Sequence, residues 1–196
     1  GQQVTSGSQQ VLIGAYAGNA LTTGAQNVAI GYKALSGEDT GNKNIAIGTN
    51  ALEALNYNGN GYNIAIGNDA GKNVSTGNLN ILIGGLAGDA LTEGDHNTAV
   101  GHAALSSETL GDRNVAIGSN ALNAQNNTSN VDAYNTAVGY SAGSVVSTGV
   151  RNTIIGGLAG DALTTGARNT ALGYAALSSE DTGGKAIAIG YGALFS

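Results

Sequence analysis

Residues 27–35 read NVAIGYKAL, and residues 97–105 read NTAVGHAAL. Segments of this kind, in which a short apolar triplet is followed by glycine, recur along the whole chain. In the triplet Val28, Ala29 and Ile30 the side chains alternate large, small and large, which is the pattern of a β-strand. The glycine that follows suits a sharp turn or a backbone with positive φ. The recurring segment therefore predicts a short strand that ends at a glycine turn.

The repeat has a nearly constant length. The motif glycines recur with a period of 17 in eight of ten steps, and the exceptions are a step of 19 after Gly48 and a step of 21 after Gly118. Four units form a longer repeat, since GGLAGDALTEG at 84–94 returns as GGLAGDALTTG at 156–166. A period of 17 is too short for a helical hairpin repeat or a propeller blade, and it fits one turn of a small β-solenoid. The motif glycines are Gly14, Gly31, Gly48, Gly67, Gly84, Gly101, Gly118, Gly139, Gly156, Gly173 and Gly190.

The composition favours thin coils. The chain has 33 Gly, one Phe and no Pro, Cys, Met or Trp, so Val, Ile, Leu and Ala must do the packing. We expect the third triplet residue, which is always Ile, Val or Leu, to face the interior. We expect the small middle residue to let another backbone, or a neighbouring subunit, approach closely. A leucine four residues after the glycine, as at Leu35, marks a second short strand or turn.

An asparagine precedes nearly every triplet. If the coils stack, these side chains form a ladder whose amides can hydrogen-bond from rung to rung. Gln10 and Ala186 take this place in the first and last units. The ladder residues are Asn27, Asn44, Asn63, Asn80, Asn97, Asn114, Asn135, Asn152 and Asn169.

Charge and composition exclude several classes of protein. The net charge is −6 with only seven Lys and Arg, which makes the chain a poor ligand for nucleic acid or anionic lipid. No apolar run approaches the roughly 20 residues that span a membrane. The absence of cysteine excludes disulfides and thiolate metal sites. Hydrophobic residues make up 41% of the chain, so the composition is not that of a disordered protein.

No constellation of catalytic residues stands out. His96 and His102 are the only histidines and flank one triplet, and we expect His96 to be a solvated turn residue. The pairs Glu38–Asp39 and Glu180–Asp181 occupy equivalent turns, where we expect solvated charges. The calcium-binding repeat G-G-x-G-x-D is absent. We therefore expect no enzyme, no cofactor and no metal site.

Two insertions provide the best candidates for a binding site. They lie at 52–63 (LEALNYNGNGYN) and 122–135 (LNAQNNTSNVDAYN), at the same corner and four coils apart. Insertions in solenoids often form the binding face, and aromatic rings with amides suit sugar recognition. We predict a host glycan or receptor contact here, and the alternatives are loop decoration or packing between subunits. The candidate residues are Tyr57, Asn58, Asn60, Tyr62, Gln125, Asn126 and Tyr134.

A second set of tyrosines follows the motif glycines directly. We expect these side chains to cover a corner of each coil rather than to bind a ligand. They are Tyr32, Tyr140, Tyr174 and Tyr191.

The segments at 27–35 and 97–105 resemble the YadA-like head repeat of trimeric autotransporter adhesins, which reads roughly N-S-V-A-I-G-x-x-S-x-A. The resemblance covers Val11 to Leu194. It implies a left-handed parallel β-roll with three chains side by side on a bacterial surface. Very similar repeats occur in bacteriophage tail fibres. The period of this chain is longer than that of the adhesin heads, and Ala-Leu replaces Ser-x-Ala after the glycine, so adhesin and tail fibre both stay open.

Together these patterns predict an all-β parallel solenoid of about eleven coils over residues 11–196, after a polar segment at 1–10. Four or five small apolar side chains per coil barely offset the entropy of ordering the backbone of that coil, which favours a homotrimer. We expect a non-enzymatic segment of an extracellular attachment fibre, on a bacterial surface or a virion tail. Its partners would be other copies of itself and a host glycan or receptor, with neither nucleic acid nor membrane insertion.

Two other functions fit the sequence less well. An ice-binding solenoid needs a regular threonine array on one face, and threonine heads only some triplets. A glycan hydrolase on a β-helix would need paired carboxylates in a long groove. The threonines are Thr98, Thr136, Thr153 and Thr170.

Overall fold

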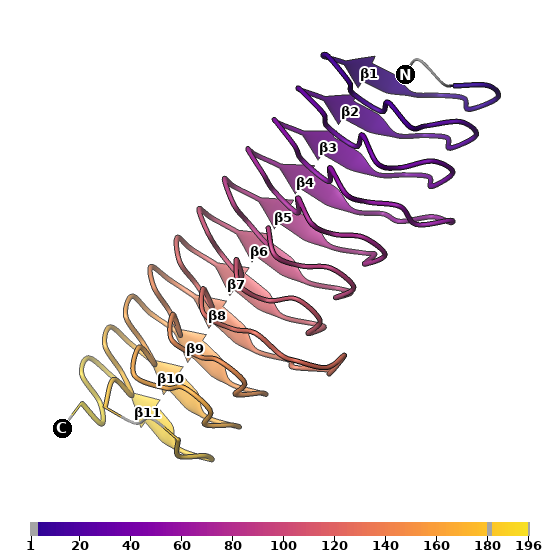
Figure 1. The fold of residues 1–196 in the computed structure, drawn as a ribbon. Coiled ribbons are helices and arrows are strands. Elements are labelled where there is room, and N and C mark those ends of the chain that lie inside the picture. Colours follow the sequence, from indigo (N-terminus) through magenta and orange to yellow (C-terminus); the bar gives the residue numbers. More distant parts are fainter. Residues whose placement is uncertain (1–3, 180–181, 196) are drawn as a thin grey trace.

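The computed structural model describes residues 4–179 and 182–195, which form one parallel β-solenoid without a helix in that part of the chain (Figure 1). Eleven strands of three residues form a single sheet in sequence order. The predicted all-β solenoid with a period of 17 is therefore confirmed. The strands are β1 (Val11–Ile13), β2 (Val28–Ile30), β3 (Ile45–Ile47), β4 (Ile64–Ile66), β5 (Ile81–Ile83), β6 (Thr98–Val100), β7 (Val115–Ile117), β8 (Thr136–Val138), β9 (Thr153–Ile155), β10 (Thr170–Leu172) and β11 (Ile187–Ile189).

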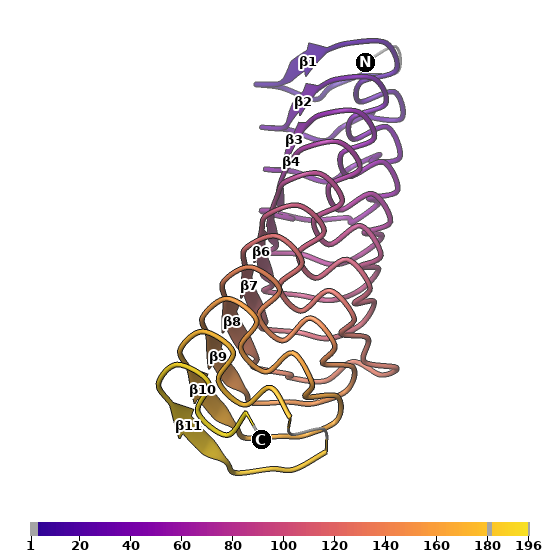
Figure 2. The ribbon, with the colours of Figure 1, turned by 90° about the vertical axis from the view of Figure 1, so that its left-hand side faces the viewer.

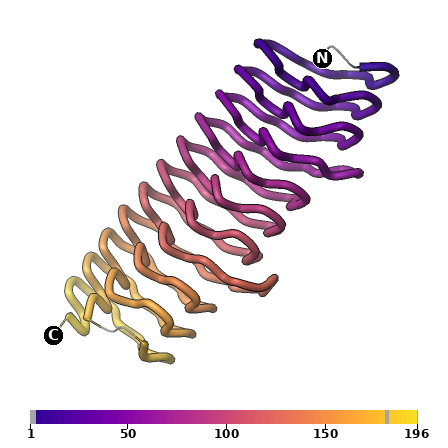
Figure 3. Tube along the Cα trace, viewed as in Figure 1, coloured from indigo at the N-terminus to yellow at the C-terminus, as the bar shows by residue number. Residues whose placement is uncertain are grey.

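The coils lie directly over one another, so that equivalent residues meet in columns. Each strand pairs in parallel with the next, and in β2 and β3 Val28 lies opposite Ile45 and Ala29 opposite Ala46. The trace of the chain shows the same stacking along the whole rod (Figure 3). With about 4.8 Å between neighbouring strands, eleven coils make a rod about 50 Å long.

The middle residue of each strand faces the interior, while the first and third residues face outward. Ala46 and Leu82 are fully buried, whereas Ile13 is 58% and Ile66 36% exposed. The prediction that the third residue faces the core is therefore wrong. So is the prediction that the small middle residue meets a neighbouring subunit. Successive strand side chains alternate between the two faces, so a three-residue strand sends only its middle side chain inward, and the thin coil accepts alanine there.

The opposite wall of the coil is a turn that carries leucine. Leu35 and Leu105 have left-handed backbones, with φ of 53° and 54°, and their side chains are fully buried. The second apolar point of the repeat is thus a turn rather than a strand. These leucines pack against the small middle residues of the sheet in one continuous core.

The four-coil repeat arises from compensation of volume between these two walls. In some coils glycine replaces the turn leucine, and one large side chain from the sheet fills the space. A Cβ on Gly71 would lie 2.6 Å from Leu82 Cδ1, and one on Gly88 would lie 2.7 Å from Leu82 Cδ2. Ile154 occupies the corresponding space beside Gly143 and Gly160 in the second super-repeat, at contacts of 2.9 and 3.3 Å.

The described part of the N-terminal segment runs beside the following coil. The N–H groups of Thr5, Ser6 and Gly7 all donate to the carbonyl oxygen of Thr22, at 2.9, 3.2 and 3.3 Å. The turned view shows this segment next to the first coils at one end of the rod (Figure 2). The described residues contain no helix that is long and apolar enough to cross a membrane.

Candidate functional site

The asparagine ladder is confirmed, and its amides bond to the backbone of the next coil. The Oδ1 atom of Asn97 accepts the N–H of Asn114 at 2.9 Å, and its Nδ2 atom donates to the carbonyl oxygen of Gly111 at 2.9 Å. Both atoms of one buried amide are therefore satisfied by the coil that follows. The ladder holds the coils in register, which is a structural role.

The insertions change only the Nδ2 half of this ladder, since the Oδ1 atoms still accept the N–H groups of Asn63 and Asn135 at 3.2 and 3.3 Å. Asn44 and Asn114 each stand one coil before an insertion, where the acceptor glycine is displaced. Asn44 Nδ2 donates instead to the carbonyl oxygen of Asn42 at 3.2 Å, and Asn114 Nδ2 donates to Asn97 Oδ1 at 3.1 Å. Other groups must therefore hold the first residues of each inserted loop.

Two buried glutamates bind the first residues of the inserted loops. The Oε1 atom of Glu108 accepts the N–H of Gly111 at 2.8 Å and of Asn127 at 3.0 Å, and its Oε2 atom accepts the side-chain amide of Gln125 at 2.9 Å. Glu38 likewise accepts the N–H of Tyr57 at 3.2 Å. Each glutamate fixes the start of the inserted loop in the next coil.

The prediction that Glu38 is solvated is therefore wrong, because its side chain is fully buried. Burial raises the pKa of Glu38 above its ordinary value of 4.5, against the opposing effect of the N–H groups of Gly41 and Tyr57. Its neighbour Asp39 is partly buried and accepts the hydroxyl of Thr22 at 2.5 Å. The corresponding pair Glu180–Asp181 lies outside the described residues.

The first insertion presents three of its four candidate residues to solvent. Asn58 and Asn60 are exposed, and Tyr62 is 46% exposed. The hydroxyl of Tyr62 accepts a hydrogen bond from Lys43 Nζ at 3.0 Å, and this ammonium lies 5.0 Å from the ring centroid. Tyr57 is half-buried and packs against the core.

The second insertion differs from the prediction at one residue. Gln125 is fully buried and bonds Glu108 and Asn135, both at 2.9 Å, so it cannot contact a receptor. Asn126 is exposed, and its Oδ1 atom accepts the hydroxyl of Thr109 at 3.0 Å. Tyr134 is 48% exposed.

Tyr62 and Tyr134 occupy equivalent places, each five residues before a motif glycine. They are four coils apart, which is about 19 Å at the spacing of a parallel sheet. The two insertions therefore do not form one pocket. They place two similar aromatic points on one line along the rod.

That line carries most of the positive charge of the chain, which the sequence analysis missed. We call it the basic column: the residue five positions before each motif glycine. Every member has positive φ, between 50° and 65°. Five of the seven Lys and Arg stand here, and alignment of the eleven units would have revealed them. The members are Gln9, Gln26, Lys43, Tyr62, Leu79, His96, Arg113, Tyr134, Arg151, Arg168 and Lys185.

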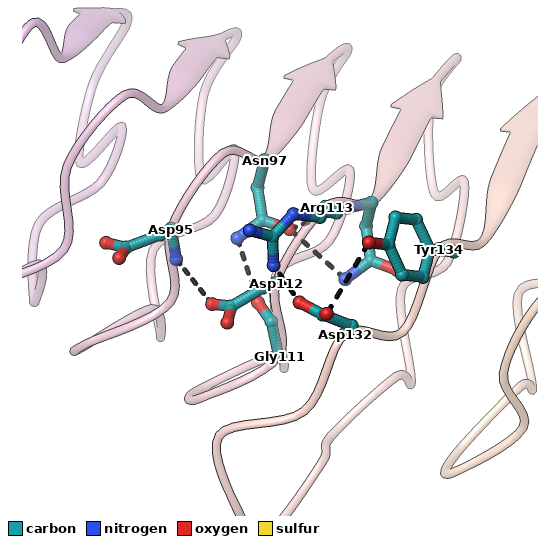
Figure 4. A network of polar contacts seen from close by, with 8 residues as sticks. Asp95, Asn97, Gly111, Asp112, Arg113, Asp132 and Tyr134 are labelled. Atoms are coloured by element: carbon teal, nitrogen blue, oxygen red, sulfur yellow. Dashed lines mark hydrogen bonds and ion pairs between the residues drawn. The ribbon is translucent and has the colours of Figure 1, made fainter.

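Acidic side chains neutralise the middle of the basic column (Figure 4). Arg113 forms an ion pair with Asp132 and lies 5.8 Å from the ring centroid of Tyr134. The hydroxyl of Tyr134 lies 3.4 Å from Asp132 Oδ2, and Asp112 Oδ1 accepts the N–H of Asp95 at 2.7 Å. The network joins three neighbouring coils at the second insertion, since its residues precede β6, β7 and β8.

The tyrosines that follow the motif glycines stand on the outside of the roll. Tyr174 and Tyr191 stack with ring centroids 5.5 Å apart, and Tyr16 meets Tyr32 edge to face at 5.8 Å. The first pair lines a shallow hollow together with Phe195. The aromatic contacts run between neighbouring coils.

The described residues hold no group of three His, Asp or Glu side chains that could bind a metal ion. His96 is exposed, as predicted for a turn residue. Comparison of the chain with protein-family models, curated proteins and solved structures found no match. The functional proposal therefore rests on the geometry of the roll and on the resemblance of its repeats.

Proposed function

We propose that this chain is a non-enzymatic structural and adhesive segment of an extracellular attachment fibre, with three copies packed side by side as a trimeric adhesin head. The observation that carries the proposal is the uncovered outer face of the sheet, formed by the first and third residues of the strands. These side chains are Val, Ile, Leu and Thr, and many are more than a third exposed. A rod built in this way needs partners along its length.

The size of the outer face supports this reasoning. A strip of eleven strands with three residues each measures about 50 Å by about 10 Å, or about 500 Å². That is at the upper end of the largest apolar patches on monomeric proteins. Because the strip is as long as the rod itself, a parallel copy of the same chain matches it over its whole length.

The resemblance of the repeats to adhesin heads supplies the finer features of the proposal, which are a left-handed roll and a threefold arrangement. The outer face takes the role that we first assigned to the alanines, since those are buried. The alternative is a bacteriophage tail fibre, whose repeats are equally similar. Antibodies against the chain would label the bacterial surface in the first case and the virion tail in the second.

The receptor contact is proposed at the exposed residues of the insertions, with Tyr62 and Tyr134 at its centre. Both rings are about half exposed and are held by cations, so they are placed to stack on sugar rings. Replacing both tyrosines by alanine should abolish binding to host cells. Retained binding of that variant would contradict this part of the proposal.

Light scattering in solution tests the assembly. The single chain has a mass of 19.2 kDa, and a trimer weighs three times as much. A measured mass near three times that of the chain supports the proposal. A monodisperse mass near 19.2 kDa would show that the outer face stays uncovered in solution and would overturn the trimer.

A further inference from the structure

The C-terminal part of the basic column differs from the rest in its neighbours. Arg151, Arg168 and Lys185 stand in three successive coils and are exposed. The residues just before them are Val150, Ala167 and Gly184, whereas Asp112 precedes Arg113. The acidic side chains that neutralise the middle of the column are thus missing from these three rungs.

Among the described residues, these three cations have no partner of the kind that the other basic residues have. Lys33 pairs with Glu53 at 2.8 Å, Lys72 with Asp69 at 3.8 Å, and Arg113 with Asp132. Lys43 bonds the hydroxyl of Tyr62. No carboxylate in the described part of the chain forms an ion pair with Arg151, Arg168 or Lys185.

The backbone fixes the spacing of the row. The N–H groups of Arg151, Arg168 and Lys185 each donate to a carbonyl of the preceding coil, at 2.7, 3.0 and 3.1 Å. All three residues have left-handed backbones, with φ of 61°, 62° and 65°. Neighbouring rungs are therefore about 4.8 Å apart, so the three residues start from stacked backbone positions that follow the rod.

We propose that this row binds a linear anionic polysaccharide, bearing carboxylate or sulfate groups, that lies along the rod. The proposal rests on the attachment function above and names the chemistry of its ligand. Guanidinium groups pair with such oxyanions through two parallel hydrogen bonds, and a row of cations matches a polymer with regularly repeated charge. Tyr134 is the next member of the column and offers a ring on which a sugar can stack.

The overall charge favours a polysaccharide over nucleic acid. The chain carries a net charge of −6, which repels a densely charged phosphate backbone away from the row itself. A polysaccharide with one carboxylate per sugar has fewer charges per unit length than duplex DNA, and it offers neutral sugar faces to the tyrosine. Nucleic acid therefore enters the experiment as a competing ligand.

The test variant is R151Q/R168Q, because glutamine already occupies this column at Gln9 and Gln26 with the same backbone. The matched control is K33Q/K72Q, which removes the same number of charges outside the column. Binding is measured with polygalacturonate, dextran sulfate, neutral dextran and a single-stranded oligonucleotide, at 50 and 200 mM salt. The mass of each variant is measured by light scattering.

We expect the wild type and the control to bind both anionic polysaccharides but not neutral dextran. Raising the salt should weaken wild-type binding about 20-fold if three cations are neutralised, and about 3-fold for the variant, which keeps one.

Unchanged binding by R151Q/R168Q, equal loss in the control, or tighter binding of the oligonucleotide would overturn the proposal. A variant that loses its assembled mass would place the row at a subunit interface and would also overturn it. A wild type that assembles but binds no polysaccharide defeats this inference alone and leaves the proposed fibre intact.

Discussion

At the scale of single residues, the motif glycines are required by both conformation and space. Their φ angles lie between 121° and 140°, a region that residues with a Cβ rarely adopt. The next coil also approaches closely, since a Cβ on Gly101 would lie 2.5 Å from the carbonyl oxygen of Gly118. The glycine column therefore permits the backbones to stack.

Replacing Gly101 by alanine should lower the free energy of unfolding by about 2–5 kcal/mol, since it adds backbone strain to an overlap with backbone atoms. Urea denaturation measures the change. Gly85→Ala is the control, because a Cβ there would meet nothing nearer than 3.6 Å. Equal stability of the two variants would contradict the role of the glycine column.

The buried Glu38 should make stability depend on pH. Burial raises its pKa in the folded state above the ordinary value of 4.5, so the folded chain holds this proton more tightly than the unfolded chain does. Its contribution is complete below about pH 4.5 and is lost as the pH rises towards the folded pKa. Compared with E38Q, the wild type should therefore lose stability between pH 4 and pH 7 in urea denaturation. A difference between the two that stays constant over this range would refute the prediction.

At the scale of the coil, the core is packed by two facing walls, which are the strand and the opposite turn. A small residue in the strand accompanies leucine in the turn, as with Ala99 and Leu105. Where the turn carries glycine, a large strand residue of the same or the next coil fills the space, as Leu82 does beside Gly88 and Gly71. The core volume is thus conserved by exchange between the two walls, in the way that well-packed interiors require.

Double substitution tests this exchange. Leu82→Ala should destabilise the protein by about 2–5 kcal/mol through a cavity, and Gly88→Leu should destabilise it through overpacking. The double variant refills the space beside Gly88, though not that beside Gly71, so it should be more stable than the sum of the single effects by about 0.5–3 kcal/mol.

The matched control for this exchange is the double variant L82A/G160L. Gly160 has φ of 58° and the same place in the other super-repeat, but it packs against Ile154. Because the two sites are far apart, their effects should add within about 0.5 kcal/mol. Additive effects in L82A/G88L as well would contradict the compensation of volume.

The sequence predicted the period, the strands and the asparagine ladder, because all three repeat at fixed spacing. It misassigned the faces of the strand. The alternation in the triplet VAI is compatible with either face pointing inward, and the greater hydrophobicity of isoleucine favoured placing it inside. Which strand side chain faces the interior is decided by the volume inside the thin coil. That volume depends on the residues of the opposite turn. Gln125 was misplaced because a single loop sequence does not show its partner Glu108. That partner shares the interior column of Leu21 and Leu55, which alignment of the units would have shown.

At the scale of the whole molecule, the inner face of the sheet is buried and its outer face is exposed. The inner face is filled by alanine and leucine within each coil, and no part of it is left for a partner. The outer face carries Val, Ile, Leu and Thr along the row of strands, and many of these side chains are exposed in a single chain. The self-association proposed for this face can be tested without disturbing the core.

Ile117→Arg should break the assembly while leaving each coil folded. Ile117 lies on the outer face of β7 and is already exposed in the single chain, so a charge there costs the fold little. In the proposed trimer the same side chain is buried against its copies, where three unpaired charges would repel one another. The mass in solution should fall from that of the trimer towards 19.2 kDa, with the β-sheet circular dichroism unchanged.

Thr76→Arg adds the same charge at an exposed turn and should keep the assembled mass. If Ile117→Arg keeps that mass as well, the chains meet through another surface, and the outer face needs a different partner.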